Sequence, residues 1–409
     1  MNALLPIASL LVSVSLLLMA HGLMGTLLPL RGLVENFSST TLGVLGALFF
    51  LGFGIGTVLG PRAINRVGHI RTFAAMAALI CISVTLQSLV AMPAVWWLAR
   101  ALTGMCLAIL FIVIESWLNA NSTNENRGLI FSVYTIITLS MITLGQMITT
   151  LSDVASFTLF AIATMLFAAS AVPVSMTRTS APTPTGTSKL RLGYLYKLSP
   201  VAVVGAFAVG WATGAFWTLG PIFAQRETGD ASMVAAFMGA TVISGAVGQL
   251  PLGWMSDHCD RRMVIIAASL FSAIAAIAHV ITAHFNPAGI IACAVFFGFF
   301  ALPLYALCAA HLNDQVAEDE YVEASSGLLL LYAAGAVVGP LLASALMDRF
   351  GAQSLFLFTG AVHSALVVFA IIRLSVRKAT PIEDKMSFSE TLVSTSTVAN
   401  LDPAASDSP

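Results

Sequence analysis

The sequence predicts an all-α membrane protein of twelve transmembrane helices, arranged as two pseudo-symmetric bundles of six. Three observations predict this fold class. Of the 409 residues, 58% are hydrophobic and only 9% are charged, whereas a soluble domain carries about 25% charged residues. The hydrophobic residues form twelve runs of bilayer length, and short motifs recur between the two halves of the chain. A soluble globule is excluded, because so little charge would leave apolar surface exposed almost everywhere.

Each hydrophobic run is long enough to cross a bilayer as a helix. A transmembrane helix needs about 20 mostly apolar residues, whereas the strands of a membrane barrel are about 10 residues long and alternate in polarity. Lipid offers the backbone no hydrogen-bond partner, which selects helices. The first run has no basic N-terminal region and is too long for a signal peptide, so it counts as a helix. The predicted helices cover residues 4–28, 41–61, 72–92, 95–118, 129–150, 154–176, 199–224, 231–255, 262–284, 287–311, 323–347 and 352–373.

Two polar segments divide the chain. Residues 177–198, with proline and glycine among serines and threonines, are predicted to be a cytosolic linker. Residues 374–409 contain too little apolar surface to fold, which predicts a disordered cytosolic tail. The predicted units are therefore an N-terminal six-helix bundle over residues 1–176 and a C-terminal six-helix bundle over residues 199–373.

The basic residues predict the orientation in the membrane. If the N-terminus is cytosolic, the inner loops and the C-terminal flank hold fourteen of the eighteen Lys and Arg residues, and the outer loops hold three. The positive-inside rule then places both termini in the cytosol. The loop over residues 312–323 carries only acidic charge, but acidic residues contribute little to that rule. The expected location is the inner (plasma) membrane of a bacterium.

The two halves share short motifs at an offset of 192 to 194 residues. At an offset of 192, Gly56 aligns with Gly248, and at 194, Gly104 aligns with Gly298. Two matches at nearly the same offset, on equivalent helices of a six-plus-six layout, indicate a duplicated scaffold. In transporters built from parallel repeats, the binding site lies between the halves near the middle of the membrane.

The segment GWMSDHCDRR after the eighth helix resembles a signature of the major facilitator superfamily, G-x-x-x-D-R/K-x-G-R-R. A degraded copy follows the second helix, where Pro61 and Asn65 replace the leading glycine and the aspartate. The stretches WLARALTGM and QLPLGWMSDHCDRR are similar to the YcaD-type branch of that superfamily. The resemblance covers about residues 4–373 and implies the major facilitator fold. The residues retained from the two signature copies are Arg66, Gly68, Gly253, Asp257, Arg261 and Arg262.

These six residues are predicted to form a conformational latch. A carboxylate such as Asp257, at the cytosolic end of the eighth helix, can accept hydrogen bonds from guanidinium groups or from the N-terminus of a neighbouring helix. Such contacts would form when the two halves close on the cytosolic side and would break when they open. The alternative interpretation is topological, with Arg261 and Arg262 only anchoring the loop inside the cell.

Apart from the first and last residues of the predicted helices, two fully charged residues lie within them, and both are on the fourth helix. A charge at the bilayer centre costs at least about 2.5–3.5 kcal/mol, so it normally faces a cavity or a partner. Helix geometry places Arg100 and Glu115 on one face, about 22 Å apart. The R-x-x-x-G segment at Arg100 and Gly104 resembles a family segment linked to proton coupling. Arg100 is predicted to hold an anion or tune a proton site, or else to snorkel; Glu115 is predicted to form a gate pair or, alternatively, to carry a proton.

Five further residues complete the predicted substrate or proton pathway. His21, near the middle of the first helix, belongs to the residue type that titrates near neutral pH; the alternative is a hydrogen-bonded core histidine. Gln146 and Gln249 could contact substrate or join helices. Trp211 and Tyr305 could wall an amphipathic cavity or pack in the core.

The predicted function is secondary active transport of a small organic solute by alternating access, coupled to protons. No phosphate-binding loop for ATP appears in the sequence. The sequence also contains neither an HExxH nor a GxSxG motif that would support an enzyme. The scarcity of buried charge disfavours a highly charged substrate. The expected partners are the solute, lipid and protons, with no nucleic acid, cofactor or metal, and the expected state is a monomer. The alternative is a transporter-like sensor or partner-binding protein that moves no solute.

Overall fold

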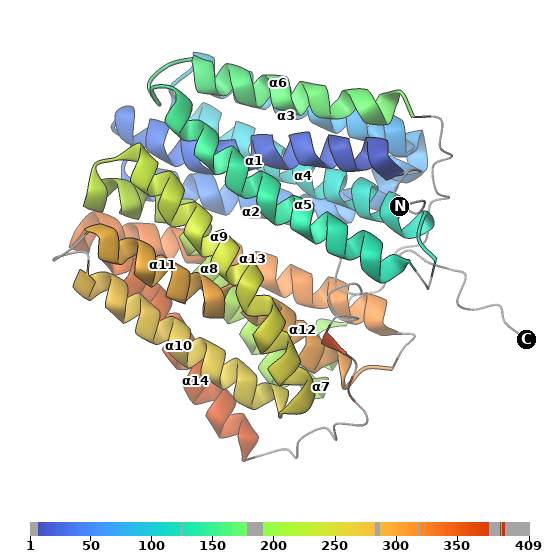
Figure 1. Ribbon diagram of the computed structural model, residues 1–409, viewed down its shortest axis with the longest axis vertical. Coiled ribbons are helices and arrows are strands. Elements are labelled where there is room, and N and C mark those ends of the chain that lie inside the picture. The colour runs from blue at the N-terminus through green and yellow to red at the C-terminus, as the bar shows by residue number, and fades with distance from the viewer. Residues whose placement is uncertain are drawn as a thin grey trace, which may run out of the picture.

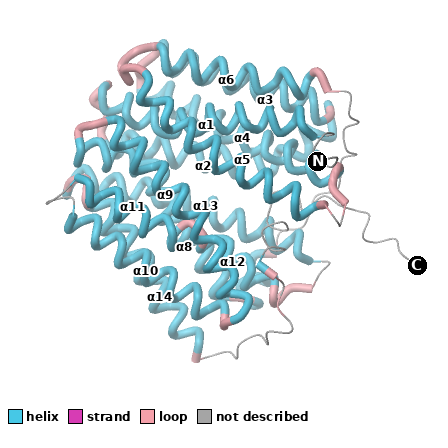
Figure 2. Tube along the Cα trace, in the orientation of Figure 1, coloured by secondary structure: helices cyan, strands magenta, loops and turns pink. Residues whose placement is uncertain are grey.

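The computed structural model describes residues 7–123, 126–177, 191–282, 287–317 and 320–375, together with Lys385, Ser387 and Phe388. The described residues form helices that are joined by loops (Figure 2). Twelve spans among them are long and apolar enough to cross a membrane. The predicted fold class is confirmed. The helices are α1 (Ala8–Val34), α2 (Ser39–Val67), α3 (His69–Leu89), α4 (Pro93–Ala120), α5 (Arg127–Ile148), η2 (Thr149–Leu151), α6 (Thr158–Ser175), α7 (Leu192–Leu198), α8 (Pro200–Thr228), α9 (Ala231–His258), α10 (Arg261–Thr282), α11 (Pro287–Ala301), α12 (Leu304–Asn313), α13 (Tyr321–Phe350) and α14 (Ser354–Leu374).

The predicted tenth helix is interrupted. Helix α11 ends at Ala301, and α12 begins at Leu304 after a turn over residues 302–303. Pro303 explains the interruption, because proline has no backbone N–H and its ring disfavours the helical conformation of the preceding residue. The two pieces still cover one membrane span, from Gly289 to Asn313.

The linker segment contains the short helix α7, which docks on the second half. Arg191, at the start of α7, forms ion pairs of 2.7 Å with Glu320 and 2.6 Å with Glu323. Tyr194 donates its hydroxyl to Glu320 at 2.8 Å. The hydrogen bonds from Arg191 and Tyr194 hold the pKa of Glu320 below its usual range. The linker is therefore held against the start of α13 by the contacts of Arg191 and Tyr194 with two acidic residues.

The two halves repeat the same helix contacts. The backbone of Gly104 in α4 lies against the carbonyl of Phe49 in α2, where a Cβ would collide with it. In the second half, Gly298 of α11 lies in the same way against the carbonyl of Thr241 in α9. Phe49 and Thr241 are 192 residues apart, and the two glycines are 194 apart. The offset between the sequence motifs is thus also the offset between equivalent close helix contacts in the two halves, which small residues permit.

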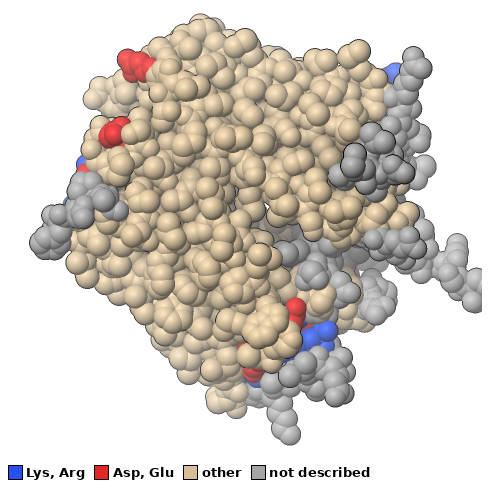
Figure 3. All heavy atoms as spheres, in the orientation of Figure 1, with Lys and Arg blue, Asp and Glu red and all other residues tan. Residues whose placement is uncertain are grey.

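The halves are sealed against each other at one end of the molecule. At the N-terminus of α2, the backbone N–H groups of Ser39 and Thr40 donate to the Asp348 carboxylate of α13, each at 2.8 Å. One turn further along α2, Gly43 lies against Ser344 of α13. We call this end the far side, and the opposite end, where α7 lies, the linker side (Figure 1). The molecular surface is hollowed between the halves toward the linker side (Figure 3).

Candidate functional site

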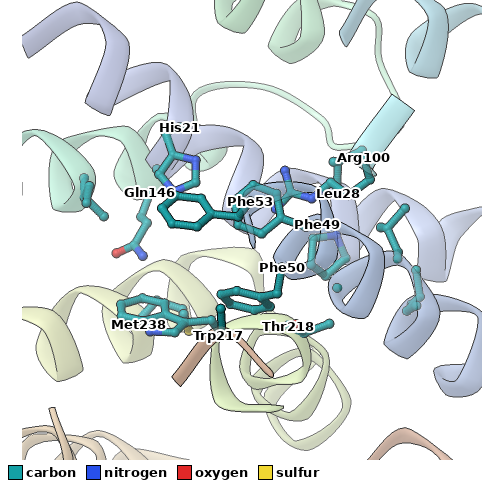
Figure 4. A pocket seen from close by; sticks show the side chains of 18 of the residues that line it. His21, Leu28, Phe49, Phe50, Phe53, Arg100, Gln146, Trp217, Thr218 and Met238 are labelled. Atoms are coloured by element: carbon teal, nitrogen blue, oxygen red, sulfur yellow. The ribbon is translucent and has the colours of Figure 1, made fainter. Parts of the chain in front are cut away.

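A cavity of about 310 Å³ lies between the two halves. Its volume is at the lower end of the range for small-molecule sites. Helices α1, α2, α4 and α5 wall it on one side, and α8, α9 and α13 wall it on the other (Figure 4). The side chains that matter most for its chemistry are His21, Phe49, Arg100 and Gln146 from the first half and Trp217, Thr218, Met238 and Tyr332 from the second.

One wall of the cavity is formed by three packed side chains from three helices, namely Arg100, Phe49 and His21. The guanidinium carbon of Arg100 lies 4.2 Å from the centroid of the Phe49 ring. The His21 ring stacks on the same phenyl ring, with centroids 5.9 Å apart and planes inclined by 18°. Gly104, one turn beyond Arg100, brings α2 close enough to α4 for this arrangement. A desolvated cation–π contact contributes roughly 2 kcal/mol, so Phe49 fixes the position of Arg100.

The polar atoms of this wall have unused hydrogen-bonding capacity. Within the described chain, Nδ1 of His21 and Oε1 of Gln146 are buried without a hydrogen-bond partner. None of the ion pairs between described residues includes Arg100. An unpaired buried polar group costs about 1–3 kcal/mol. Because all three side chains line the cavity, a ligand there can supply the missing partner.

A second cavity surrounds Glu115 and shares Phe111 with the first. The Glu115 side chain is buried, and its carboxylate is hydrogen-bonded to the Tyr134 hydroxyl of α5. Gln249 of α9 lines the same space from the other half. Arg100 and Glu115 of α4 therefore line two adjacent cavities that share Phe111.

Two residues of the predicted pathway lie behind the cavity wall. The carbonyl of Trp211 lies against Gly339 of α13, and its ring contacts Phe358 of α14 at a centroid distance of 6.2 Å. Tyr305 packs edge-to-face on Tyr332, with ring centroids 5.0 Å apart. Since Tyr332 lines the cavity, Tyr305 contacts the site through that ring.

The predicted latch of the second half is an ion-pair network at the linker side of α9 and α10. Arg261 pairs with Asp314 at 2.7 Å, with both side chains 1% exposed, and with Asp257 at 3.2 Å. Arg262 pairs with Asp260 at 2.7 Å. A buried pair of this kind is costly to break, because the remaining charge stays desolvated.

A residue of the C-terminal tail completes this network. The backbone N–H of Phe388 donates to the Asp257 carboxylate at 2.9 Å. The Phe388 ring is 5% exposed and lies against Gly253, where a side chain would collide with it. Lys385 donates to the Cys259 carbonyl. The predicted disorder of residues 374–409 otherwise falls mostly outside the described residues and stays a prediction.

The corresponding region of the first half carries no such network among the described residues. Arg66 is exposed at the end of α2, and Gly68 turns the chain into α3 with a φ of +84°. His69, at the start of α3, is hydrogen-bonded through Nε2 to the Ser116 hydroxyl at 2.6 Å. This neutral contact connects α3 to α4.

Sequence reasoning did not identify the phenylalanines that line the site. Phe49 and Phe53 lie one helical turn apart on α2, and Phe50 and Phe111 also line the cavity. Their helices are apolar on every face, so hydrophobic periodicity cannot distinguish a cavity wall from a lipid-facing surface. The spacing of Phe49 and Phe53 was the one available signal, and it is equally typical of core packing.

Comparison with known proteins identifies the family of the chain. The family model of the Major Facilitator Superfamily matches residues 10–228 and 202–401. The MFS-type transporter YcaD of Escherichia fergusonii is 27% identical over 392 residues, covering 92% of this chain and 98% of the relative. YcaD of Escherichia coli K12 is 26% identical over 361 residues, covering 87% and 93%. These findings confirm the predicted resemblance.

Solved structures share the fold. The nucleoside transporter NupG superposes with a TM-score of 0.73 at 16% identity, covering 92% of this chain and all of that one. A D-xylose-proton symporter gives a TM-score of 0.67 at 12% identity, covering 92% and 98%. At such identities the likeness concerns the fold alone.

Proposed function

Because the chain belongs to the Major Facilitator Superfamily, we propose that it moves a small organic solute by alternating access and couples this movement to protons. Family membership makes the chain a multi-pass membrane transporter and not an enzyme. The moving parts in this proposal are the bundles over residues 1–176 and 199–373, joined by the linker 177–198 and followed by the tail 374–409.

We assign the linker side to the cytosol and the membrane to the bacterial inner membrane. The support is the excess of Lys and Arg in the loops of that side. In this orientation the structure represents a state open to the cytosol, with the far-side seal between Asp348 and α2 in place. The opposite state requires this seal to open while the halves close over the linker side.

The single observation that carries the proposal is the central cavity, which lies between two repeated halves that are sealed on one side. Arg100, His21 and Gln146 supply its polar contacts, and Glu115 with Gln249 forms a second polar position toward the linker side. Proton coupling is assigned to His21, Arg100 and Glu115, which line the two cavities. In this proposal, a proton gained or lost at one of these groups changes the charge or the hydrogen bonding near the substrate. Trp211 and Tyr305 support the wall from behind.

The latch residues control the balance between the two states in this proposal. In the open state Arg261 pairs with Asp257 and Asp314. Asp257 also accepts a hydrogen bond from the backbone N–H of the tail residue Phe388. Closure of the linker side would bring the end of α9 toward the first half, where Arg66 is exposed. Exchange of partners at Asp257 is the expected switching event.

Transport by purified protein in lipid vesicles tests the proposal. A panel of labelled small organic solutes is offered with and without an imposed pH difference, in both directions. We expect at least one solute to accumulate only with the pH difference, and Arg100→Ala to reduce that accumulation by at least tenfold. If no solute moves while the protein still binds ligand, the protein is a sensor or binding protein, and transport is excluded.

A further inference from the structure

The central cavity carries a positive charge without a compensating acidic group. Of its described lining residues, Arg100 and His21 are the ones that can carry positive charge, and none is an aspartate or glutamate. The guanidinium rests on the Phe49 ring and is part of no ion pair between described residues. A desolvated cation that lacks a counter-charge favours an anionic ligand and repels a cationic one.

The rest of the wall is suited to an apolar, aromatic body. Phe49, Phe50 and Phe53 line the cavity from α2, and Trp217 and Tyr332 face them from the second half. Few hydrogen-bonding side chains remain, so a polyhydroxylated solute would leave several of its hydroxyl groups unpaired. Aromatic walls instead bind flat rings by offset or edge-to-face contacts.

The charged and apolar parts are separated within one cavity. In the view of Figure 4, Arg100 lies at one end of the group of Phe49 and Phe53, and Gln146 lies at the other. Trp217 and Met238 form the opposite wall from the second half. A ligand that places an anionic group at Arg100 can therefore extend its ring system along the aromatic residues.

We infer that the cavity binds an organic monoanion with an aromatic body, whose anionic group is held by Arg100. This inference rests on the proposed function, because the cavity is taken as the substrate site. The small volume limits the body to a small ring system. A single guanidinium matches one carboxylate, sulfonate or similar group, and a bidentate fork is the geometry in which arginine binds such groups.

Binding to the full-length purified protein in detergent tests the inference. The probes are three matched series on benzene, naphthalene and indole rings, namely the acetic acids, their primary amides and the corresponding ethylamines. Binding is followed by the shift in melting temperature and by tryptophan fluorescence. We expect saturable binding of acids, with amides and amines at least tenfold weaker.

Two variants separate the role of Arg100 from a general effect of charge. Arg100→Gln should weaken binding of the acids by at least tenfold, and Arg100→Lys should weaken it less. Arg226→Gln is the matched control, because Arg226 is an exposed arginine near the end of α8, and it should bind as the wild type does. If Arg100→Gln does not fold, the three probe series on the wild type still decide the question.

Several results would overturn the inference. They are equal or tighter binding of amides or amines, no binding by any acid, equal stabilisation by sodium chloride alone, or undiminished binding by folded Arg100→Gln. Flux measurements distinguish failure of the anion-site inference from failure of the transport proposal. Acids that bind through Arg100 but are not transported would sustain the anion site and exclude transport, whereas flux of an amine without acid binding would do the opposite.

Discussion

The two halves of the molecule share a scaffold but differ in chemistry. The contact of Gly104 with α2 recurs at Gly298 with α9, so packing has been retained in both copies. At the same offsets, Arg100 corresponds to Ala294 and His21 to Thr213. Ala294 is fully buried, and Thr213 uses its hydroxyl on the carbonyl of Val209 at 2.6 Å. Arg100, His21 and Gln146 of the cavity lining therefore all belong to the first half, and the second half supplies a mainly aromatic wall with the hydroxyl groups of Thr218 and Tyr332.

The linker-side loops show the reverse asymmetry. His69 and Arg261 occupy equivalent positions, 192 residues apart, at the starts of α3 and α10. His69 makes one neutral hydrogen bond to Ser116, whereas Arg261 holds two carboxylates, Asp257 and Asp314. The charge of the cavity therefore lies in the first half, and the described ion-pair network of the proposed latch lies in the second.

The largest expected effect on stability comes from breaking the charged loop of the second half. Arg261→Ala leaves Asp314 buried without its cation, which should lower the free energy of unfolding by about 3–5 kcal/mol. His69→Ala at the equivalent position removes one neutral hydrogen bond and should cost about 0.5–1.5 kcal/mol. Thermal unfolding in detergent measures both. Equal losses for the two variants would show that the loops are energetically alike and would remove the asymmetry.

The symmetric part of this comparison was accessible from the sequence, and the asymmetric part only in outline. Run lengths and the offset of Gly104 and Gly298 predict twelve helices in two halves, because bilayer thickness and close packing act locally. Arg100 could be placed at a cavity because a charge in lipid is costly. Its contact with Phe49 could not be predicted, since it depends on how α2 and α4 cross. The docking of Phe388 was likewise hidden, because a lone aromatic in a polar tail carries no periodic signal.

A bulky residue at either repeated glycine should be nearly as damaging. Gly104→Val and Gly298→Val each place a side chain against a backbone carbonyl, and such overpacking typically costs about 1–3 kcal/mol. The control is Gly54→Val in α2, where an added Cβ meets nothing within 4 Å. The fraction of monodisperse protein and the melting temperature report the effect. If one of the glycine pair tolerates valine and the other does not, the packing is not equivalent in the two halves.

The far-side seal connects the halves and should respond to loss of a single charge. Asp348→Asn weakens two hydrogen bonds to the N-terminus of α2, where a carboxylate is worth about 0.3–1 kcal/mol more than a neutral group. We expect a severalfold faster maleimide labelling of Ser344→Cys, which lies against Gly43 in the seal and outside the cavity lining, in a Cys259→Ser background. The control is Asp153→Asn, whose carboxylate accepts from Ala155 in its own loop. An unchanged labelling rate in Asp348→Asn would mean that the glycine contacts alone hold the seal.

The smallest expected effect concerns the linker, which joins both halves but docks on one. Arg191 and Tyr194 lower the pKa of Glu320, so the docking contributes to stability above the unfolded pKa of that carboxyl and is lost as the pH falls through its lower folded pKa. All three groups are exposed to solvent, so the effect on global stability should be small. Hydrogen exchange at residues 192–198, measured relative to the intrinsic rate at each pH, should accelerate in Arg191→Gln near neutral pH and in the wild type only at acidic pH. Tyr196→Phe is the control within α7, because the Tyr196 side chain is exposed, and exchange as fast in that variant as in Arg191→Gln would show that the acidic pair does not specify the docking.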